Sequence, residues 1–264
     1  MTTNRLRQRW QGGQAAVGGW CVTGSPLAAE LLAVEGFDYV CVDCQHGLVS
    51  YDGMVPVLQA ISRTDVTPIV RVPWNDPGDI GKALDAGAEA VVVPMVNSAE
   101  EAARAAAACR YPPEGGRSFG PVRSGLFLGA GAEPVAVNRQ VVCLVMIETI
   151  VAVERADQIC STPGVDGIYI GPADLAVSMG LSPSFSVPSK EHADAIETVR
   201  LACERAGIIA GIHTGGGEAA RGYLEQGFQM TTLATDAALL RKAASHELAI
   251  ARGATSAAPR DGYS

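Results

Sequence analysis

An alternation between apolar, β-branched runs and helix-like stretches constrains the fold of this chain more than any other feature. It recurs about eight times along 264 residues. The apolar runs are continuous, as they must be in a sheet whose two faces are both buried. Strands are predicted over residues 17–22, 38–43, 67–72, 90–94, 141–147, 165–170, 208–212 and 228–233. This pattern predicts an α/β protein, a single-domain (β/α)₈ TIM barrel over residues 1–253 followed by a flexible tail over 254–264.

A doubly wound open sheet is the alternative architecture. Such a sheet carries a Gly-x-Gly-x-x-Gly turn after an early strand, whereas the glycine run at 215–217 comes late and lacks this spacing. Two segments interrupt the alternation, Ser182–Ser189 and the glycine- and proline-rich Tyr111–Arg139. We interpret the longer one as a loop, because structureless segments of this length inside a domain are usually functional or disordered.

Composition excludes several classes of partner. The chain has 20 basic and 28 acidic residues and a net charge of −8, which argues against a nucleic-acid-binding surface. It has no apolar run of about 18 residues and no secretory signal, so we expect no membrane partner and a cytoplasmic location. Its seven cysteines are an odd number and indicate reduced thiols. Cys41 and Cys44 lack a second pair at zinc-site spacing.

Charged side chains follow four of the predicted strands. Asp43 and His46 come at the end of the second strand, Arg71 closes the third, Glu148 closes the fifth and Asp174 follows the sixth. A barrel gathers the C-terminal ends of its strands at one mouth, where enzymes of this fold place their chemistry. Each side chain alone is also explained as a cap or a rim ion pair, but their convergence favours a functional site.

The residue types point to metal-assisted enolate chemistry on a 2-oxo acid. Glu148 and Asp174 are hard oxygen donors on neighbouring strand ends, which suits Mg²⁺ or Mn²⁺ with positions left for substrate oxygens. Arg71 would stabilise negative charge on the keto oxygen. Histidine is the residue type suited to proton transfer near neutral pH, so His46 is the expected general base, with Asp43 orienting its ring.

Two further features complete this hypothesis. The predicted helix start made of Gly171, Pro172, Ala173 and Asp174 would hold the substrate carboxylate with its backbone amides. No lysine is placed for a Schiff base, since all three lie in predicted helices, at positions 82, 190 and 242.

At these residues the sequence resembles the HpcH/HpaI aldolases, metal-dependent class II pyruvate aldolases that include 4-hydroxy-2-oxoheptanedioate aldolase. The resemblance runs from about Val17 to Leu248 and is carried by five motifs in order: Val42-Asp-Cys-Gln-His-Gly47, Val70-Arg-Val-Pro-Trp-Asn-Asp-Pro77, Arg110-Tyr-Pro-Pro-Glu-Gly115, Met146-Ile-Glu-Thr149 and Val165-Asp-Gly-Ile-Tyr-Ile-Gly-Pro-Ala-Asp-Leu175.

The resemblance implies a homohexameric barrel whose divalent metal is bound by Glu148 and Asp174, with Co²⁺ and Zn²⁺ as further candidates beside Mg²⁺ and Mn²⁺. It also implies that His46 is the base, that Arg71 is the transition-state stabiliser and that the backbone of Ala173 contacts the substrate. The remaining implied residues are Asp85, which would raise the basicity of the histidine across a subunit boundary, and the substrate-binding Trp20 and Met146.

The chain departs from the family pattern at several positions. Cys44-Gln45 replaces the usual Gly-Glu before the histidine, Met146 replaces a substrate-binding glutamine, and His213 stands where many relatives are apolar. We therefore expect an aldolase that reversibly cleaves 4-hydroxy-2-oxo acids to pyruvate, or a close 2-oxo acid, and an aldehyde through a metal-stabilised enolate. The alternatives are an acyl-CoA lyase, for which Arg117 and Arg123 are the candidate phosphate-binding residues, a 2-oxo acid decarboxylase, and a non-catalytic barrel that binds a 2-oxo acid.

Overall fold

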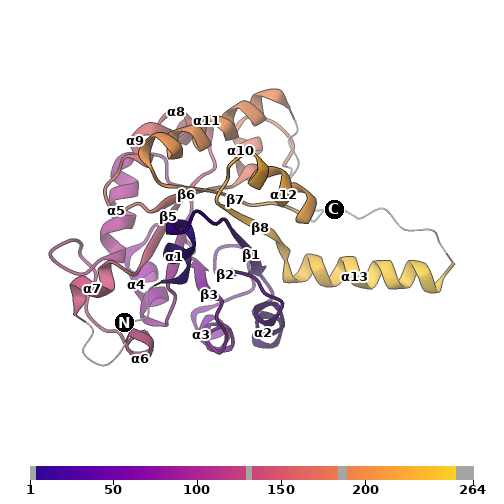
Figure 1. Cartoon of the computed structure of the whole chain (residues 1–264), viewed down its shortest axis with the longest axis horizontal. Helices are drawn as coiled ribbons and strands as arrows, with labels where there is room; N and C mark the ends of the chain where they lie inside the picture. The colour runs from indigo at the N-terminus through magenta and orange to yellow at the C-terminus, as the bar shows by residue number, and fades with distance from the viewer. Residues whose placement is uncertain (1–3, 129–132, 184–188, 254–264) are drawn as a thin grey trace.

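The computed structural model of the chain describes residues 4–128, 133–183 and 189–253, and it folds into a closed barrel of eight parallel strands in sequential order (Figure 1). The strands are β1 (Ala16–Cys21), β2 (Tyr39–Asp43), β3 (Thr67–Arg71), β4 (Ala90–Val93), β5 (Val142–Ile147), β6 (Gly167–Ile170), β7 (Ile209–Ile212) and β8 (Met230–Thr235). The predicted (β/α)₈ barrel is confirmed. The predicted tail over 254–264 lies outside the described residues.

Ten of the described helices lie outside the barrel, and seven of them begin at a residue whose side chain accepts a hydrogen bond from an amide of the first turn. Ser25 Oγ accepts from the amide of Ala28, and Asp76 Oδ1 accepts from two amides of the next helix, each cap being followed by proline at the first helical position. These helices are α2 (Pro26–Val34), α3 (Tyr51–Ile61), α4 (Pro77–Asp85), α5 (Ala99–Cys109), α8 (Ile150–Glu154), α9 (Ala156–Cys160), α10 (Pro172–Ser178), α11 (Lys190–Ala206), α12 (Gly217–Glu225) and α13 (Asp236–Ala251).

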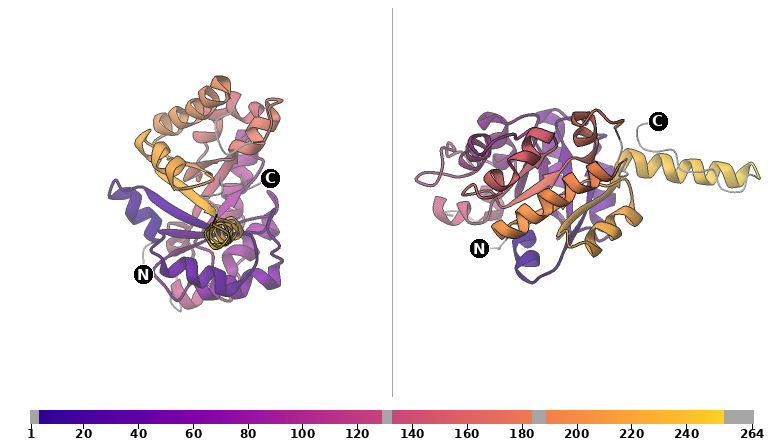
Figure 2. Two further views of the ribbon diagram at one scale, coloured as in Figure 1. Left: turned by 90° about the vertical axis from the view of Figure 1, so that its right-hand side faces the viewer. Right: turned by 90° about the horizontal axis from the view of Figure 1, so that it is seen from above.

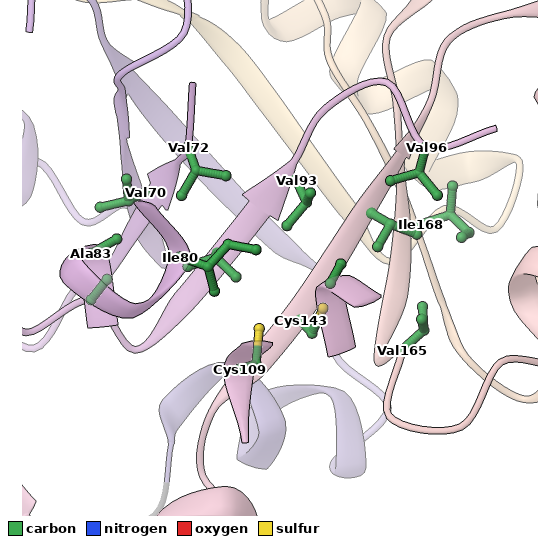
Figure 3. Close-up of a cluster of buried hydrophobic side chains, with 14 of the residues drawn as sticks. Val70, Val72, Ile80, Ala83, Val93, Val96, Cys109, Cys143, Val165 and Ile168 are labelled. Carbon is green, nitrogen blue, oxygen red and sulfur yellow. The ribbon is translucent and has the colours of Figure 1, made fainter. Parts of the chain in front are cut away.

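The core has two shells because successive strand residues point to opposite faces of the sheet. Outward-facing side chains such as Val70, Val93 and Ile168 belong to one buried cluster with Ile80 and Cys109 of the surrounding helices (Figure 3). The inward-facing set fills the barrel and is dominated by large side chains, namely Trp20, Tyr39, Ile69, Leu144, Met146, Tyr169 and Met230.

A short N-terminal helix, α1 (Arg5–Gln11), closes the end of the barrel where the strands begin. Its Leu6 is buried within the interior cluster. Asn4 Nδ2 donates to the carbonyl of Glu89 just before β4, and Trp10 Nε1 donates to the carbonyl of Gln229 just before β8. The interior is therefore plugged at this end and opens toward the C-terminal ends of the strands.

The segment Tyr111–Arg139 is not wholly a loop, which corrects the prediction. It contains two short helices, α6 (Gly125–Leu128) and α7 (Pro134–Asn138). Asn138 explains part of this order, since its side chain donates to the carbonyl and accepts from the amide of Tyr111. The second interruption, 182–189, lies largely outside the described residues.

The C-terminal helix α13 leaves β8 and projects from the body of the molecule instead of lying along the barrel wall (Figures 1 and 2). Several of its apolar side chains are exposed, with Leu240 at 70% and Ile250 at 57% of their accessible surface. Among the described residues, no helix has the length and hydropathy needed to cross a membrane.

A close approach inside the barrel gives a stability test. A Cβ added at Gly18 would lie 2.1 Å from the ring of Tyr39, whereas one added at Gly81 in α4 meets no atom within 4 Å. We expect Gly18→Ala to lower the free energy of unfolding by about 3 kcal/mol through overpacking. The control Gly81→Ala should raise it by about 0.5–1 kcal/mol, because alanine favours a helix interior. Urea unfolding of both variants measures this, and a Gly18→Ala variant as stable as the parent would contradict the described β1–β2 packing.

Candidate active site

The predicted site residues point into the barrel because each lies two positions after an inward-facing strand residue, and alternate residues of a strand face the same side. Asp43 lies two residues after Cys41, Arg71 two after Ile69, and Glu148 two after Met146, all interior residues. The same register brings Gly171 and His213 to the inner face after β6 and β7. The structure therefore brings residues at the ends of β2, β3, β5, β6 and β7 to one mouth.

A buried ion pair between Asp43 and Arg71 forms the floor of this mouth. Arg71 Nε donates to Asp43 Oδ1 at 2.9 Å, and Arg71 Nη2 donates to Oδ2. The guanidinium also lies over the Trp20 ring, 5.2 Å from its centroid, and Trp20 Nε1 donates to Asp43 at 3.1 Å. Burial alone would raise the pKa of Asp43, but its hydrogen bonds to Arg71 and the charge of Arg71 hold that pKa below its usual value. Trp20, expected to bind substrate, is buried here as a support for this pair.

Asp43 holds the backbone of the loop that carries His46. Its Oδ1 accepts from the backbone amides of Gln45 and His46 at 3.0 and 3.2 Å. The His46 side chain is exposed at the mouth. A side chain in this position is accessible from the mouth.

Glu148 is a buried carboxyl group with one fixed oxygen. Its Oε1 accepts from the amide of Met95 at 2.7 Å, and Met95 adopts a left-handed backbone with φ of 55°. On its other side a Cβ at Gly171 would lie 2.6 Å from Glu148 Oε2, so only glycine fits there. Burial, aided by the nearby negative charge of Asp174, raises the pKa of Glu148 to about 7.

Asp174 lies in the first turn of α10 and is exposed at the mouth. The amides of Ala173 and Asp174 precede Leu175, whose amide makes the bond to Gly171 O that begins the helix. Pro172 has no amide hydrogen, so it offers the substrate no donor, contrary to the expectation for the whole segment. The fully buried His192 places its Nε2 2.9 Å from the Pro172 carbonyl oxygen and so anchors this turn to α11.

Glu148 and Asp174 fit a hard divalent cation. Within the described residues no group of three or more His, Cys, Asp or Glu side chains could hold a metal ion. The two carboxyl groups are close enough for one to raise the pKa of the other, an arrangement that a bound cation would relieve. A site with two protein carboxylates suits Mg²⁺ or Mn²⁺, which keep water and substrate oxygens as further ligands.

Asp85 does not join this site within one chain. It ends α4 near the plugged end of the barrel and pairs with Arg117, 2.6 Å away. Arg117 lines a cavity of about 330 Å³ together with Asn4 and Glu89 at that same end. Arg123 donates to the carbonyl of the neighbouring Ala86. The two arginines considered for a phosphate-binding strip are thus engaged away from the mouth.

Sequence reasoning missed a hydroxyl-bearing group of side chains inside the mouth. Tyr169 Oη lies 2.5 Å from Thr232 Oγ1 and 3.2 Å from His213 Nδ1. The His213 ring packs edge-on against Trp20, with centroids 4.9 Å apart. Little in the sequence signals this group, because tyrosine and threonine are ordinary strand residues. The exception is His213, a polar side chain directly after β7.

The comparisons with known proteins identify the family of this chain. Residues 17–243 match the family model described as HpcH/HpaI aldolase/citrate lyase. The chain belongs to this family. A hydroxypyruvate/pyruvate aldolase from Rhizorhabdus wittichii is 42% identical over 94% of this chain and 99% of its own length. A 4-hydroxy-2-oxo-heptane-1,7-dioate aldolase from Shigella flexneri is 36% identical over 91% and 90% of the two chains.

A solved structure gives the same result. The crystal structure of an HpcH/HpaI aldolase/citrate lyase family protein from Burkholderia cenocepacia superposes with a TM-score of 0.90 at 34% identity, covering 95% of this chain and 100% of that one. The resemblance read from the five sequence motifs is confirmed, and membership of the HpcH/HpaI family makes this chain a lyase of the aldolase type.

The pKa of Glu148 predicts a pH-dependent stability in metal-free protein. Its pKa is raised from 4.5 to about 7, so the folded state retains a proton that the unfolded chain releases and loses relative stability as the pH rises through this interval. We expect Glu148→Gln, which keeps the acceptor for Met95, to exceed the parent in stability by up to about 3 kcal/mol at pH 8 and to match it near pH 4.5.

Thermal unfolding with a chelator present, from pH 4.5 to 8, tests this expectation. The surface substitution Glu114→Gln is the control and should leave the pH profile of the parent unchanged. Parallel profiles for the parent and Glu148→Gln across the whole range would show that the carboxyl titrates at its ordinary pKa.

Proposed function

We propose that this chain is a divalent-metal-dependent aldolase that reversibly cleaves 4-hydroxy-2-oxo acids to pyruvate, or a close 2-oxo acid, and an aldehyde. The observation that carries the proposal is the Asp43–Arg71 pair beside the buried Glu148 at one barrel mouth. Arg71 provides a fixed positive charge at the mouth, and the neighbouring Glu148 provides a carboxylate that a cation would stabilise. Glu148 and Asp174 would hold Mg²⁺ or Mn²⁺, which when bound supplies positive charge that polarises the 2-oxo group.

Arg71 is poised to stabilise negative charge that develops on the keto oxygen. Asp43 occupies Nε and Nη2, and among the described residues Nη1 has no hydrogen-bond partner. A guanidinium held in place by a buried carboxylate needs little reorganisation when negative charge develops beside it. The amides of Ala173 and Asp174 would bind the substrate carboxylate, and Met146 and Glu148 both lie beside Gly171.

His46 moves the proton in this scheme. It accepts the proton of the 4-hydroxyl group, the C3–C4 bond breaks, the aldehyde leaves and the bonding pair stays on C3 as an enolate. Protonation of C3 then gives the 2-oxo acid, and aldol addition is the reverse path. The exposed position of His46 on a loop pinned by Asp43 supports this role.

The rival functions receive less support. An acyl-CoA lyase would use Arg117 or Arg123 for phosphate, but Arg117 is buried against Asp85 and Tyr111. A 2-oxo acid decarboxylase and a non-catalytic binding barrel would use the same mouth. Measuring aldehyde release, CO₂ release and binding without turnover distinguishes them from an aldolase.

We further propose that the enzyme works as a homo-oligomer, a hexamer by resemblance, in the cytoplasm. Exposed Leu27, Leu31 and Val34 form an apolar stripe on α2, and Leu240 and Ile250 are exposed on the projecting α13. Apolar faces of this kind are usually covered by another subunit. A partner subunit would also bring an Asp85 to the His46 of its neighbour.

Metal removal tests the proposed function. Retro-aldol turnover of a 4-hydroxy-2-oxo acid should fall at least about 100-fold with a chelator and return on addition of Mg²⁺ or Mn²⁺. Asp174→Asn should raise the metal concentration needed for half-maximal rate, whereas Asp194→Asn on the surface of α11 should not. Turnover that survives complete metal removal would exclude the proposed mechanism. Release of CO₂ instead of an aldehyde would identify a decarboxylase, and binding of pyruvate without turnover would identify a binding barrel.

The oligomer proposal has its own test. Combining Leu240→Glu with Ile250→Glu should place charges in the proposed contact and reduce the assembly to smaller species, measured by light scattering after gel filtration. The charge-reversing control Lys242→Glu on the same helix should leave the assembly intact. A monomeric parent protein would contradict the proposal.

A further inference from the structure

The loop between β4 and α5 contains a left-handed backbone position that no other non-glycine residue of the described chain adopts. Met95 has a φ of 55°, and the other described residues with positive φ are all glycine. A side chain makes this conformation unfavourable, so a methionine stays in it only when its surroundings hold it there. The amide of Met95 donates to Glu148 Oε1 at 2.7 Å. The strained residue is therefore the one that contacts a proposed metal ligand.

The side chain of Asn97 holds Met95 in this conformation. Asn97 Nδ2 donates to the carbonyl of Met95 at 2.9 Å, and Asn97 Oδ1 accepts from the hydroxyl group of Thr149. Both partners agree with this orientation of the amide. The Met95 carbonyl can only accept, so it faces the nitrogen. The Thr149 oxygen already accepts from the amide of Ala152, so its proton is left for Asn97 Oδ1.

Asn97 is itself fixed by the helices on both sides of the loop. Its amide donates to Glu101 Oε2 in the first turn of α5 at 2.7 Å, and its carbonyl accepts from Nη1 of Arg155 at the end of α8 at 3.2 Å. Asn97 therefore ties the loop after β4 to the segment directly after β5, where Glu148 and Thr149 lie.

This bridge sets the orientation of the Glu148 carboxylate. Rotation of Met95 to a negative φ would turn its amide relative to its carbonyl, so that either the bond to Asn97 or the bond to Glu148 Oε1 would break. With both bonds made, Oε1 is occupied, and among the described residues no donor reaches Oε2. Oε2 lies on the side where Gly171 leaves room, and it is the oxygen that remains for a cation.

We propose that Asn97 is a positioning residue for the divalent cation. It holds Met95 in the left-handed conformation, and the Met95 amide in turn directs Glu148 Oε2 toward the ion. The inference rests on the proposed metal-dependent function and adds to it a residue that sets the affinity for the metal. The hydrogen bonds of Asn97 within the described chain go to the loop and to the neighbouring helices, and none goes to Glu148 itself.

Binding of Mn²⁺ to the full-length protein without substrate measures this role apart from catalysis. Titration of the metal-free protein, followed through the EPR signal of free Mn²⁺, gives the dissociation constant. Asn97→Ala should raise this constant about tenfold, an effect typical of losing a group that orients a metal ligand. Adding Met95→Gly to Asn97→Ala should restore most of the affinity, because glycine adopts the left-handed conformation without support.

Ser98→Ala is the matched control at the neighbouring position. It removes the cap of α5, where Ser98 Oγ accepts from the amide of Glu101, and it leaves the contacts of Asn97 with Met95 in place. This variant should lower the stability of the protein, as the loss of a helix cap does, while its dissociation constant for Mn²⁺ stays that of the parent.

A second substitution tests the same contact with little change of shape. Asn97→Asp keeps the acceptor for Thr149 and removes the donor to Met95. It should also weaken Mn²⁺ binding, whereas its added negative charge alone would strengthen the binding of a cation. If Asn97→Ala does not fold, this variant decides.

The outcomes separate this inference from the proposed function. Parent-like Mn²⁺ affinity in the folded Asn97 variants overturns the role of Asn97 and leaves the metal-dependent aldolase intact. Weaker binding that Met95→Gly fails to restore shows that Asn97 does not act through the backbone of Met95, which also overturns the inference. A parent protein that binds no Mn²⁺ overturns the proposed metal site, and the inference fails with it.

Discussion

The buried ion pair between Asp43 and Arg71 is the interaction on which the mouth of this barrel depends. It joins the ends of β2 and β3, receives the indole N–H of Trp20 from β1, and fixes the backbone of the loop that carries His46. Burying two charges is costly unless each is well hydrogen-bonded, and here the carboxylate accepts from a guanidinium, an indole and two amides. The pair is therefore a rigid unit, and it restrains the Trp20 ring and the His46 loop that are hydrogen-bonded to it.

The register of the strands explains why so much of the site could be predicted. Charged residues that interrupt otherwise apolar strands must lie at strand ends, and in a barrel those ends converge, so Asp43, Arg71 and Glu148 were predictable from position and residue type. The start of α10 was predictable from a glycine–proline pair after β6. These predictions needed only local pattern and the geometry of parallel strands.

What could not be predicted depends on contacts between distant residues. Helix α1 is polar and short, and only its contacts with strand starts elsewhere in the chain show that it is a plug. The Asp43 carboxylate was expected to face a histidine three residues away but faces an arginine 28 residues away. The contacts of Thr232 with the hydroxyl groups of Tyr39 and Tyr169 were hidden because tyrosine and threonine are ordinary strand residues. These contacts become visible only when three strands are brought together.

The plug at the strand-start end has a consequence for how the chain folds as it is made. Trp10 bonds a carbonyl 219 positions later, and β1 completes the barrel by pairing with β8. Strand β1 therefore waits for β8, and the barrel cannot close until β8 has been synthesised. The apolar strands of the barrel stay exposed until then. The nascent chain therefore needs protection from aggregation, whereas the closed barrel buries these strands.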